Sequence, residues 1–151
     1  MNTHPELRFK DKNGHPFPDW AEKRLGDIGE IISGLTYSPE DITDTGILVL
    51  RSSNIQNGKI SLDDNVFVNL NIDQEKLTKK NDILICVRNG SKKLIGKTAY
   101  VGDIAHKATH GAFMLIFRSP MNHFIKHLFE TKPYKKQVYA DFGASINSFN
   151  G

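Results

Sequence analysis

The chain contains a stretch with the residue types of a phosphate-binding loop, Gly90-Ser-Lys-Lys-Leu-Ile-Gly96-Lys97-Thr98. Such a loop has four residues between its first glycine and the Gly-Lys-Thr, because that length wraps backbone amides around one phosphate. Here five residues intervene. The apolar pattern also predicts a strand over residues 95–101, whereas the lysine of a phosphate-binding loop opens a helix. The stretch therefore favours a basic strand–loop–strand unit, and nucleotide hydrolysis is the weaker alternative.

A metal-dependent nuclease needs carboxylates that converge on one Mg²⁺ ion. Asp103 and residues 130–132 (Glu-Thr-Lys) match the order of such ligands, but this glutamate falls near the end of a predicted helix. His123 and His127 lack the intervening glutamate of a zinc peptidase. The sequence also lacks the nucleophile motif Gly-x-Ser-x-Gly and the Asn/Asp-Pro-Pro-aromatic motif of adenine methyltransferases. We therefore predict no catalytic residue and no metal site, with a metal nuclease as a weaker alternative.

Two polar turns that follow predicted strands carry the side chains that read DNA. The first turn is Arg51-Ser52-Ser53-Asn54, and the second is Arg88-Asn89-Gly90-Ser91-Lys92-Lys93. Arginine can bond guanine through two donors, asparagine can bond adenine, and serine or lysine can hold the backbone. Two such turns in one chain indicate nucleic-acid binding.

The distribution of charge supports the same interpretation. Residues 1–87 hold 10 lysines and arginines against 14 acidic residues, whereas residues 88–151 hold 10 against 3. Four of the six histidines also lie in the second part. A strongly basic region favours a polyanion as ligand, and nucleic acid is the commonest soluble polyanion. Charge alone leaves a solvated basic face without a partner as the alternative.

The composition is that of one ordinary folded domain of 151 residues, with 38% hydrophobic and 25% charged residues. The sole cysteine, Cys86, excludes an internal disulfide and lies in an apolar run, where we expect a buried, inert thiol. The N-terminus is polar, unlike a signal peptide, and no apolar run approaches membrane-spanning length. We therefore expect a cytoplasmic protein that does not bind a membrane.

The proline-rich residues 1–19 are predicted as an irregular arm, which leaves residues 20–151 as the folded domain. Residues 82–87 are apolar on both faces, so we predict a central strand there. The other predicted elements are strands over 30–33, 47–50, 65–68, 95–101 and 112–117, a polar loop over 106–111, a short helix over 73–78, and helices over 121–131 and 134–142. We expect both late helices to pack on the sheet through Phe124, Leu128 and Phe129. Short strands followed by helices indicate an α+β fold.

These segments, taken in order, resemble the target-recognition domain of type I restriction–modification specificity subunits. The similar segments are Trp20-Ala-Glu-Lys-Arg-Leu25-Gly26-Asp27-Ile28, Glu30-Ile-Ile-Ser-Gly34-Leu-Thr36, Leu48-Val-Leu-Arg51-Ser-Ser-Asn54-Ile55, Lys80-Asn81-Asp82-Ile-Leu-Ile, and Gly90-Ser91 with Ile95-Gly96-Lys97-Thr98-Ala99. The family usually has glycine where this chain has Asn81, and Lys92-Lys93 lengthens the last segment. Residues 140–148 resemble the stretch that leads to the family's conserved helices. The likeness covers residues 18–149 and stops before the long spacer helices, so we expect one recognition domain without them. We interpret Trp20, Leu25, Gly26 and Gly34 as structural.

The resemblance implies an α+β fold with a mixed, mainly antiparallel sheet and C-terminal helices. It also implies a domain without catalysis or cofactor that reads one half of a bipartite site on double-stranded DNA. Methylation and cleavage would belong to its partners, the modification and restriction subunits. The DNA-contact positions carried over are Arg51, Ser52, Ser53, Asn54, Arg88, Asn89, Ser91 and Lys97, and charge alone adds Lys92, Lys93 and Lys107. The alternative is a truncated interaction domain that resembles a specificity subunit but does not bind DNA productively.

Overall fold

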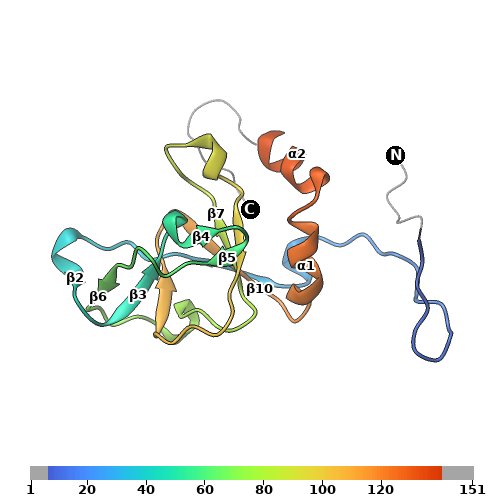
Figure 1. Cartoon of the computed structure of the whole chain (residues 1–151), viewed down its shortest axis with the longest axis horizontal. Coiled ribbons are helices and arrows are strands. Elements are labelled where there is room, and N and C mark those ends of the chain that lie inside the picture. The colour runs from blue at the N-terminus through green and yellow to red at the C-terminus, as the bar shows by residue number, and fades with distance from the viewer. Residues whose placement is uncertain (1–6, 141–151) are drawn as a thin grey trace.

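The structure is a computed structural model that describes residues 7–140 as short strands, single 3-10 turns and two α-helices (Figure 1). The strands are β1 (Glu30–Ser33), β2 (Ile42–Thr43), β3 (Ile47–Leu50), β4 (Ile55–Gln56), β5 (Lys59–Ile60), β6 (Phe67–Val68), β7 (Ile83–Cys86), β8 (Thr98–Tyr100), β9 (Ala108–His110) and β10 (Met114–Arg118). The 3-10 turns are η1 (Leu25–Asp27), η2 (Pro39–Asp41), η3 (Ser52–Asn54), η4 (Gln74–Lys76) and η5 (Lys92–Leu94). The helices are α1 (Asn122–Leu128) and α2 (Lys132–Ala140).

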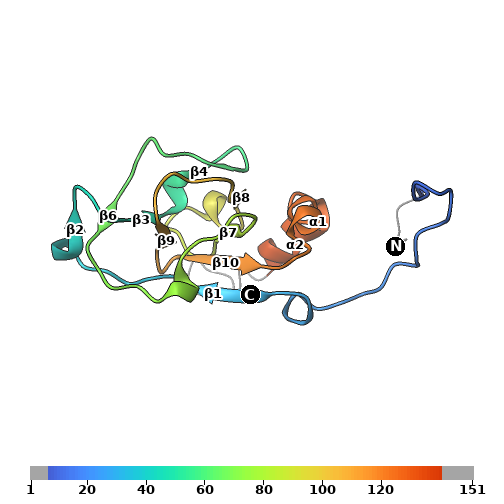
Figure 2. The same cartoon turned by 90° about the horizontal axis from the view of Figure 1, so that it is seen from below.

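Two sheets form the centre of the fold. The larger has the strand order β1-β10-β7-β8-β5-β4, and the smaller has the order β2-β6-β3-β9. The pairs β3–β9 and β5–β8 are parallel, and the other pairs are antiparallel. The smaller sheet lies on one side of the larger, and α1 and α2 lie on the other (Figures 1 and 2). This arrangement confirms the prediction of an α+β fold with a mixed, mainly antiparallel sheet and late helices.

Strand β7 lies inside the larger sheet, between β10 and β8, as its apolar sequence predicted. Leu84 and Cys86 pack in a core that includes residues of the smaller sheet, whereas Ile83 and Ile85 pack in a second core with the helices. Alternate side chains of one strand are therefore buried on opposite faces. Burial on both faces explains why the strand lacks polar alternation.

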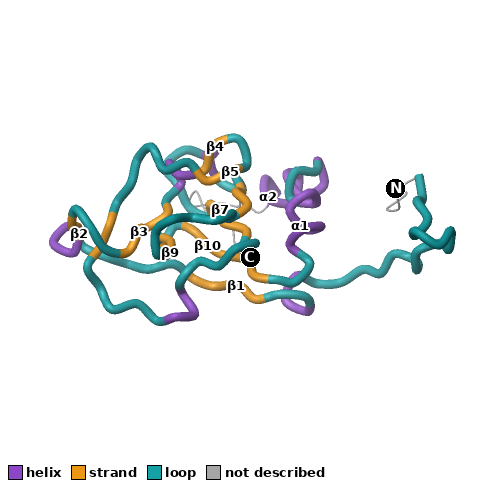
Figure 3. Tube along the Cα trace, turned by 60° about the horizontal axis from the view of Figure 1, so that its bottom comes forward, coloured by secondary structure: helices purple, strands orange, loops and turns teal. Residues whose placement is uncertain are grey.

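Helix α1 contacts the larger sheet through Ile125 and Phe129, which pack with Phe117 of β10. Phe129 was predicted correctly, but the prediction for Phe124 and Leu128 is wrong, since these side chains are 40% and 43% exposed. The row of Phe124 and Leu128 and the row of Ile125 and Phe129 both fit the helical period. The sequence alone does not indicate which of the two rows faces the sheet. Phe124 lies instead beside the segment that precedes η1, where the ring centroids of Trp20 and Phe124 are 5.8 Å apart. Both helices stand beside the sheets, and loops connect most other elements (Figure 3).

The predicted polar loop over residues 106–111 is wrong at its centre, where the structure has the buried strand β9. Thr109 donates a hydrogen bond to the carbonyl of Lys76 at 2.8 Å, and His110 donates through Nε2 to the carbonyl of Ile32 at 2.9 Å. Burial lowers the pKa of His110. These polar side chains can be interior because each has a backbone partner distant in sequence.

Smaller differences concern the ends of elements. The predicted helix over residues 73–78 is the single 3-10 turn η4. The predicted strand over residues 95–101 starts only at Thr98, because the chain first forms η5. Short segments of this kind have few hydrogen bonds of their own, and their limits therefore depend on tertiary contacts.

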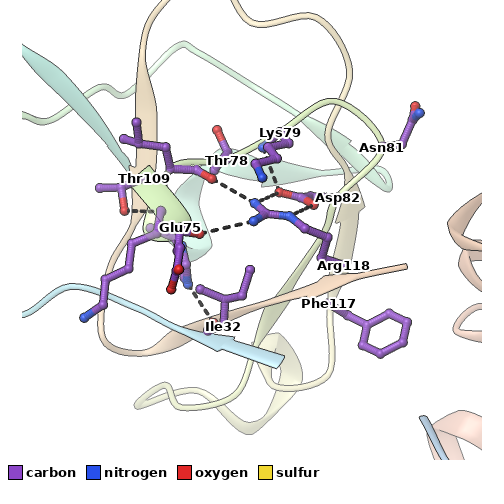
Figure 4. A network of polar contacts seen from close by, with 12 residues as sticks. Ile32, Glu75, Thr78, Lys79, Asn81, Asp82, Thr109, Phe117 and Arg118 are labelled. Carbon is purple, nitrogen blue, oxygen red and sulfur yellow. Dashed lines mark hydrogen bonds and ion pairs between the residues drawn. The ribbon is translucent and has the colours of Figure 1, made fainter. Parts of the chain in front are cut away.

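A buried ion pair joins the start of β7 to the end of β10 (Figure 4). The Asp82 carboxylate accepts bonds from Arg118 Nε at 2.9 Å and Nη2 at 2.8 Å, and from the Lys79 amide at 2.7 Å. Arg118 also donates to the carbonyls of Leu77 at 2.8 Å and Glu75 at 3.2 Å. The bond to Asp82 raises the pKa of Arg118. Arg118 therefore attaches η4 and the residue that follows it to the sheet.

Gly34 lies against the turn between β9 and β10. A Cβ atom at this position would come within 1.9 Å of the carbonyl oxygen of Gly111, whereas a Cβ at Gly26 would have no atom within 4 Å. The close approach allows the amide of Leu35 to donate to the carbonyl of His110 at 2.7 Å. The structural interpretation of Gly34 thus has a steric basis, and that of Gly26 has none.

Replacement of Gly34 by alanine should therefore destabilise the protein. We expect Gly34→Ala to lower the free energy of unfolding by about 3 kcal/mol, the upper end of overpacking costs, because the clash is with backbone. Gly26→Ala, the matched control, should be neutral or slightly stabilising. Urea unfolding followed by circular dichroism measures both. Equal midpoints for the two variants would contradict the steric argument.

Candidate nucleic-acid interface

Strand pairing brings the polar turns to one end of the fold. Strands β3 and β9 are parallel, so the turns that follow them leave on the same side. Strand β10 is antiparallel to β7 and starts where β7 ends, and β8 also starts there. We call this region the loop end and define it as residues 34–37, 51–54, 87–97 and 111–113. It unites segments that lie far apart in the sequence.

A cavity of about 500 Å³ opens at the loop end. Its lining residues are Leu35, Thr36, Tyr37, Arg51, Ser52, Ser53, Asp64, Gly111, Ala112, Phe113 and Met114. Hydroxyl and guanidinium groups thus line the same cavity as aromatic and aliphatic side chains. Such a mixture can bond the polar edge of a base and pack against an apolar part of it.

The two polar turns are linked by side chains. Asn89 Nδ2 donates to Ser52 Oγ at 2.9 Å, and Asn89 Oδ1 accepts from the amide of Ser91 at 2.9 Å. The Arg88 guanidinium lies 5.7 Å from the centroid of the Phe113 ring. The carbonyl of Phe113 also accepts bonds from the amides that begin the second turn. The turns therefore form one surface, with Arg88 placed beside it.

Asn54 supports the first turn from inside the protein. Its side chain is fully buried, and Oδ1 accepts from the Arg51 amide at 2.8 Å. Its Nδ2 donates to the carbonyls of Ser61 at 2.9 Å and Asp64 at 3.1 Å. All its donors and its acceptor oxygen are thus used within the protein, so we remove Asn54 from the proposed DNA contacts and assign it a positioning role.

Arg51 is held by an acidic neighbour. Its Nη2 lies 2.8 Å from a carboxylate oxygen of Asp64, which orients the guanidinium and offsets part of its charge. Both side chains are partly exposed, at 32% and 63%, so the pair can exchange for a ligand without burying an unpaired charge.

The lysines divide between the two ends of the fold. Lys92 and Lys93 are exposed on η5, and Lys97 is exposed just before β8. Lys93 and Lys97 line a second hollow of about 340 Å³ together with Lys135 and Glu130. Lys107 precedes β9 and therefore lies at the opposite end from the turns, so it is not part of the loop end. Its inclusion rested on charge alone, and we remove it from the proposed contacts.

The catalytic alternatives find no support in this geometry. Lys97 directly precedes strand β8, whereas a phosphate-binding loop needs a helix there. Asp103 pairs with Lys80 at 2.7 Å, whereas Glu130 lines the hollow beside α2. Among residues 7–140, no three His, Cys, Asp or Glu side chains gather as metal ligands. Cys86 is buried as predicted, and burial raises the pKa of its thiol to about 11.

Sequence reasoning missed several residues that line the cavity and the second hollow. Phe113, Tyr37 and Asp64 line the cavity, and Lys135 lines the second hollow, yet no motif marked them. Thr36 lies in the Gly-x-Thr motif, which was the available signal for this segment. In the part of the chain that the structure describes, neither helix is long and apolar enough to cross a membrane.

Comparison with solved structures assigns the fold to the class of type I specificity subunits. The crystal structure of the S subunit of the type I restriction–modification system from M. genitalium aligns with a TM-score of 0.52 and 17% identity, over 83% of this chain and 34% of that one. A structure described in terms of complex assembly and conformational transition of the type I R-M system aligns with a TM-score of 0.55 and 16% identity, over 76% of this chain and 29% of that one.

The sequence identifies the family. A family model described as type I restriction modification DNA specificity domain matches residues 18–146, and the chain belongs to this family. It is 30% identical over 138 residues to the EcoKI type I restriction enzyme specificity subunit of Escherichia coli (strain K12). It is 31% identical over 140 residues to the StySPI specificity subunit of Salmonella potsdam. Each alignment covers 85% of this chain and 30% of the relative, so the chain spans about a third of their length.

Proposed function

We propose that this domain binds double-stranded DNA through its loop end and reads one half of a bipartite target. The observation that carries the proposal is the hydrogen-bonded pair of turns, in which Asn89 donates to Ser52 and Arg88 lies over Phe113. The proposed contacts are Arg51, Ser52, Ser53, Arg88, Asn89, Ser91, Lys92, Lys93 and Lys97. Arginine and serine on rigidly held turns supply base-edge and phosphate contacts, and the exposed lysines supply phosphate contacts.

We further propose that the domain contributes recognition without catalysis. Its partners would be the modification and restriction subunits of a type I system, which would methylate and cleave the DNA. Family membership supports this assignment, as does the buried, inert state of the cysteine. We also propose that the domain acts in the cytoplasm, where the proposed DNA ligand and partner subunits would be found.

Two lysines test the position of the DNA. The affinity of the chain for random duplex DNA is measured by fluorescence anisotropy at several salt concentrations. We expect Lys97→Gln to weaken binding and to reduce the slope of log affinity against log salt by about one, because one phosphate contact is lost. Lys107→Gln removes the same charge from the opposite end and should leave the slope unchanged.

The two variants have the same net charge, so a general electrostatic effect would change both slopes equally. Equal slopes would show that the loop end does not hold the DNA. A wild-type chain whose affinity does not depend on salt would overturn the proposed function itself, since phosphate contacts release counterions.

A further inference from the structure

We propose that Phe113 reads the C5-methyl group of a thymine in the major groove of the bound DNA, beside a base contacted by Arg88. This inference rests on the proposed function and extends it to a residue that carries no polar group. Phe113 would then be a specificity-determining residue of the domain.

Phe113 is an exposed aromatic side chain at the tip of a fixed turn. The residue is 54% exposed and lines the 500 Å³ cavity together with Arg51, Ser52 and Ser53. Its backbone is held on both sides: its carbonyl accepts from the amides of Val87 at 3.0 Å and Arg88 at 3.2 Å, and the next amide, of Met114, donates to the carbonyl of Gly111 at 2.9 Å. The backbone that carries the exposed ring is therefore held in place by the loops.

The chemistry of the neighbours limits what the ring can contact. Arg51, Ser52 and Ser53 line the same cavity and Arg88 lies over the ring, and arginine and serine side chains can bond polar base edges. A phenyl ring cannot make these hydrogen bonds to base edges. Thymine, however, presents an apolar group in the major groove, its C5-methyl. An apolar ring between hydrogen-bonding side chains matches a thymine flanked by bases that are read through polar contacts.

Arg88 links this contact to its neighbour. Its guanidinium lies over the Phe113 ring, an arrangement that cation–π attraction favours. The stacked pair presents the donors of arginine and the apolar ring side by side. The preferred half-site should therefore contain a thymine next to the base, most simply guanine, that Arg88 bonds.

The test removes the methyl group from the DNA. A preferred duplex is first selected from a random pool with the wild-type chain in the presence of the modification subunits. Each thymine of that duplex is then replaced singly by uracil, which lacks only the methyl group. We expect one replacement to weaken wild-type binding about fourfold, the factor for burial of one methyl-sized group.

The variant Phe113→Ala should bind the thymine duplex at least as weakly as the wild type binds the sensitive uracil duplex, and should not distinguish the two duplexes. Phe17→Ala is the matched control, because Phe17 has the same 54% exposure but lies in the N-terminal segment. It should keep the full thymine preference.

Three outcomes would overturn the inference. A Phe113→Ala chain that still prefers thymine would assign the methyl contact to another residue. If no uracil replacement weakens wild-type binding, and Phe113→Ala weakens binding equally to thymine and uracil duplexes, the ring would insert between bases instead of reading a methyl group. A wild-type chain that selects no sequence would overturn the proposed function together with this inference, whereas the first two results leave DNA binding intact.

Discussion

The chain with both Arg51→Ala and Arg88→Ala is expected to lose most of its preference for its target sequence. Each arginine that bonds a base through two donors contributes about 1–3 kcal/mol of discrimination, so the double variant should lose about 2–6 kcal/mol on the target. Random duplexes should lose less, because the lysines at the loop end still contact phosphates. Competition between target and random duplexes at fixed salt measures the difference.

Arg24→Ala provides the control for loss of a guanidinium. Arg24 is exposed and precedes η1, so it lies outside the loop end, and its replacement should preserve the preference. Circular dichroism melting would check that the double variant is folded. If that folded variant still selected the same sequence as the wild type, the two turns would not read the bases.

The variant Arg118→Met should lose a large part of the stability of the fold. Asp82 is 2% exposed in its side chain, so loss of its partner leaves a carboxylate buried without a counter-charge. Breaking one side of a buried pair costs about 3–5 kcal/mol, compared with a total of about 5–15 kcal/mol for a typical domain. The urea midpoint of unfolding should fall accordingly.

The exposed pair Lys80–Asp103 offers a matched comparison. Its atoms lie 2.7 Å apart, almost as in the buried pair, but its side chains are 62% and 81% exposed. Lys80→Met should leave the midpoint unchanged, because solvent screens the exposed pair. The double variant Asp82→Leu with Arg118→Met should recover part of the loss, since no charge is then buried alone. A midpoint for Arg118→Met equal to that for Lys80→Met would refute the assigned role.

Elements with one dominant physical signal could be predicted from the sequence. The strand β7 followed from an apolar run, and the buried cysteine followed from its place in that run. The two late helices followed from their period. Where several patterns fitted equally, the sequence did not decide. The choice of Phe124 and Leu128 instead of Ile125 was of this kind, because neighbouring rows of one helix are equally apolar.

The remaining errors concern contacts between distant segments. Strand β9 looked like a loop because the backbone carbonyls that Thr109 and His110 bond lie more than thirty residues away. The same parallel pairing with β3 separates Lys107 from the loop end, although its charge suggested otherwise. Asn54 resembled a base-reading residue until its buried amide bonds were visible. Residue type suggested the chemistry of the proposed site, but strand pairing determines which residues lie in it.

The positions of the Arg118–Asp82 pair and of the polar turns have a consequence for how such a domain can evolve. They lie at opposite ends of β7, whose four residues span about 13 Å. Substitutions at this separation usually act additively, so changes in the turns need not weaken the pair. Natural variation or laboratory grafting can therefore exchange the turns for new ones while the inherited framework stays intact. New target sequences can arise on one scaffold in this way.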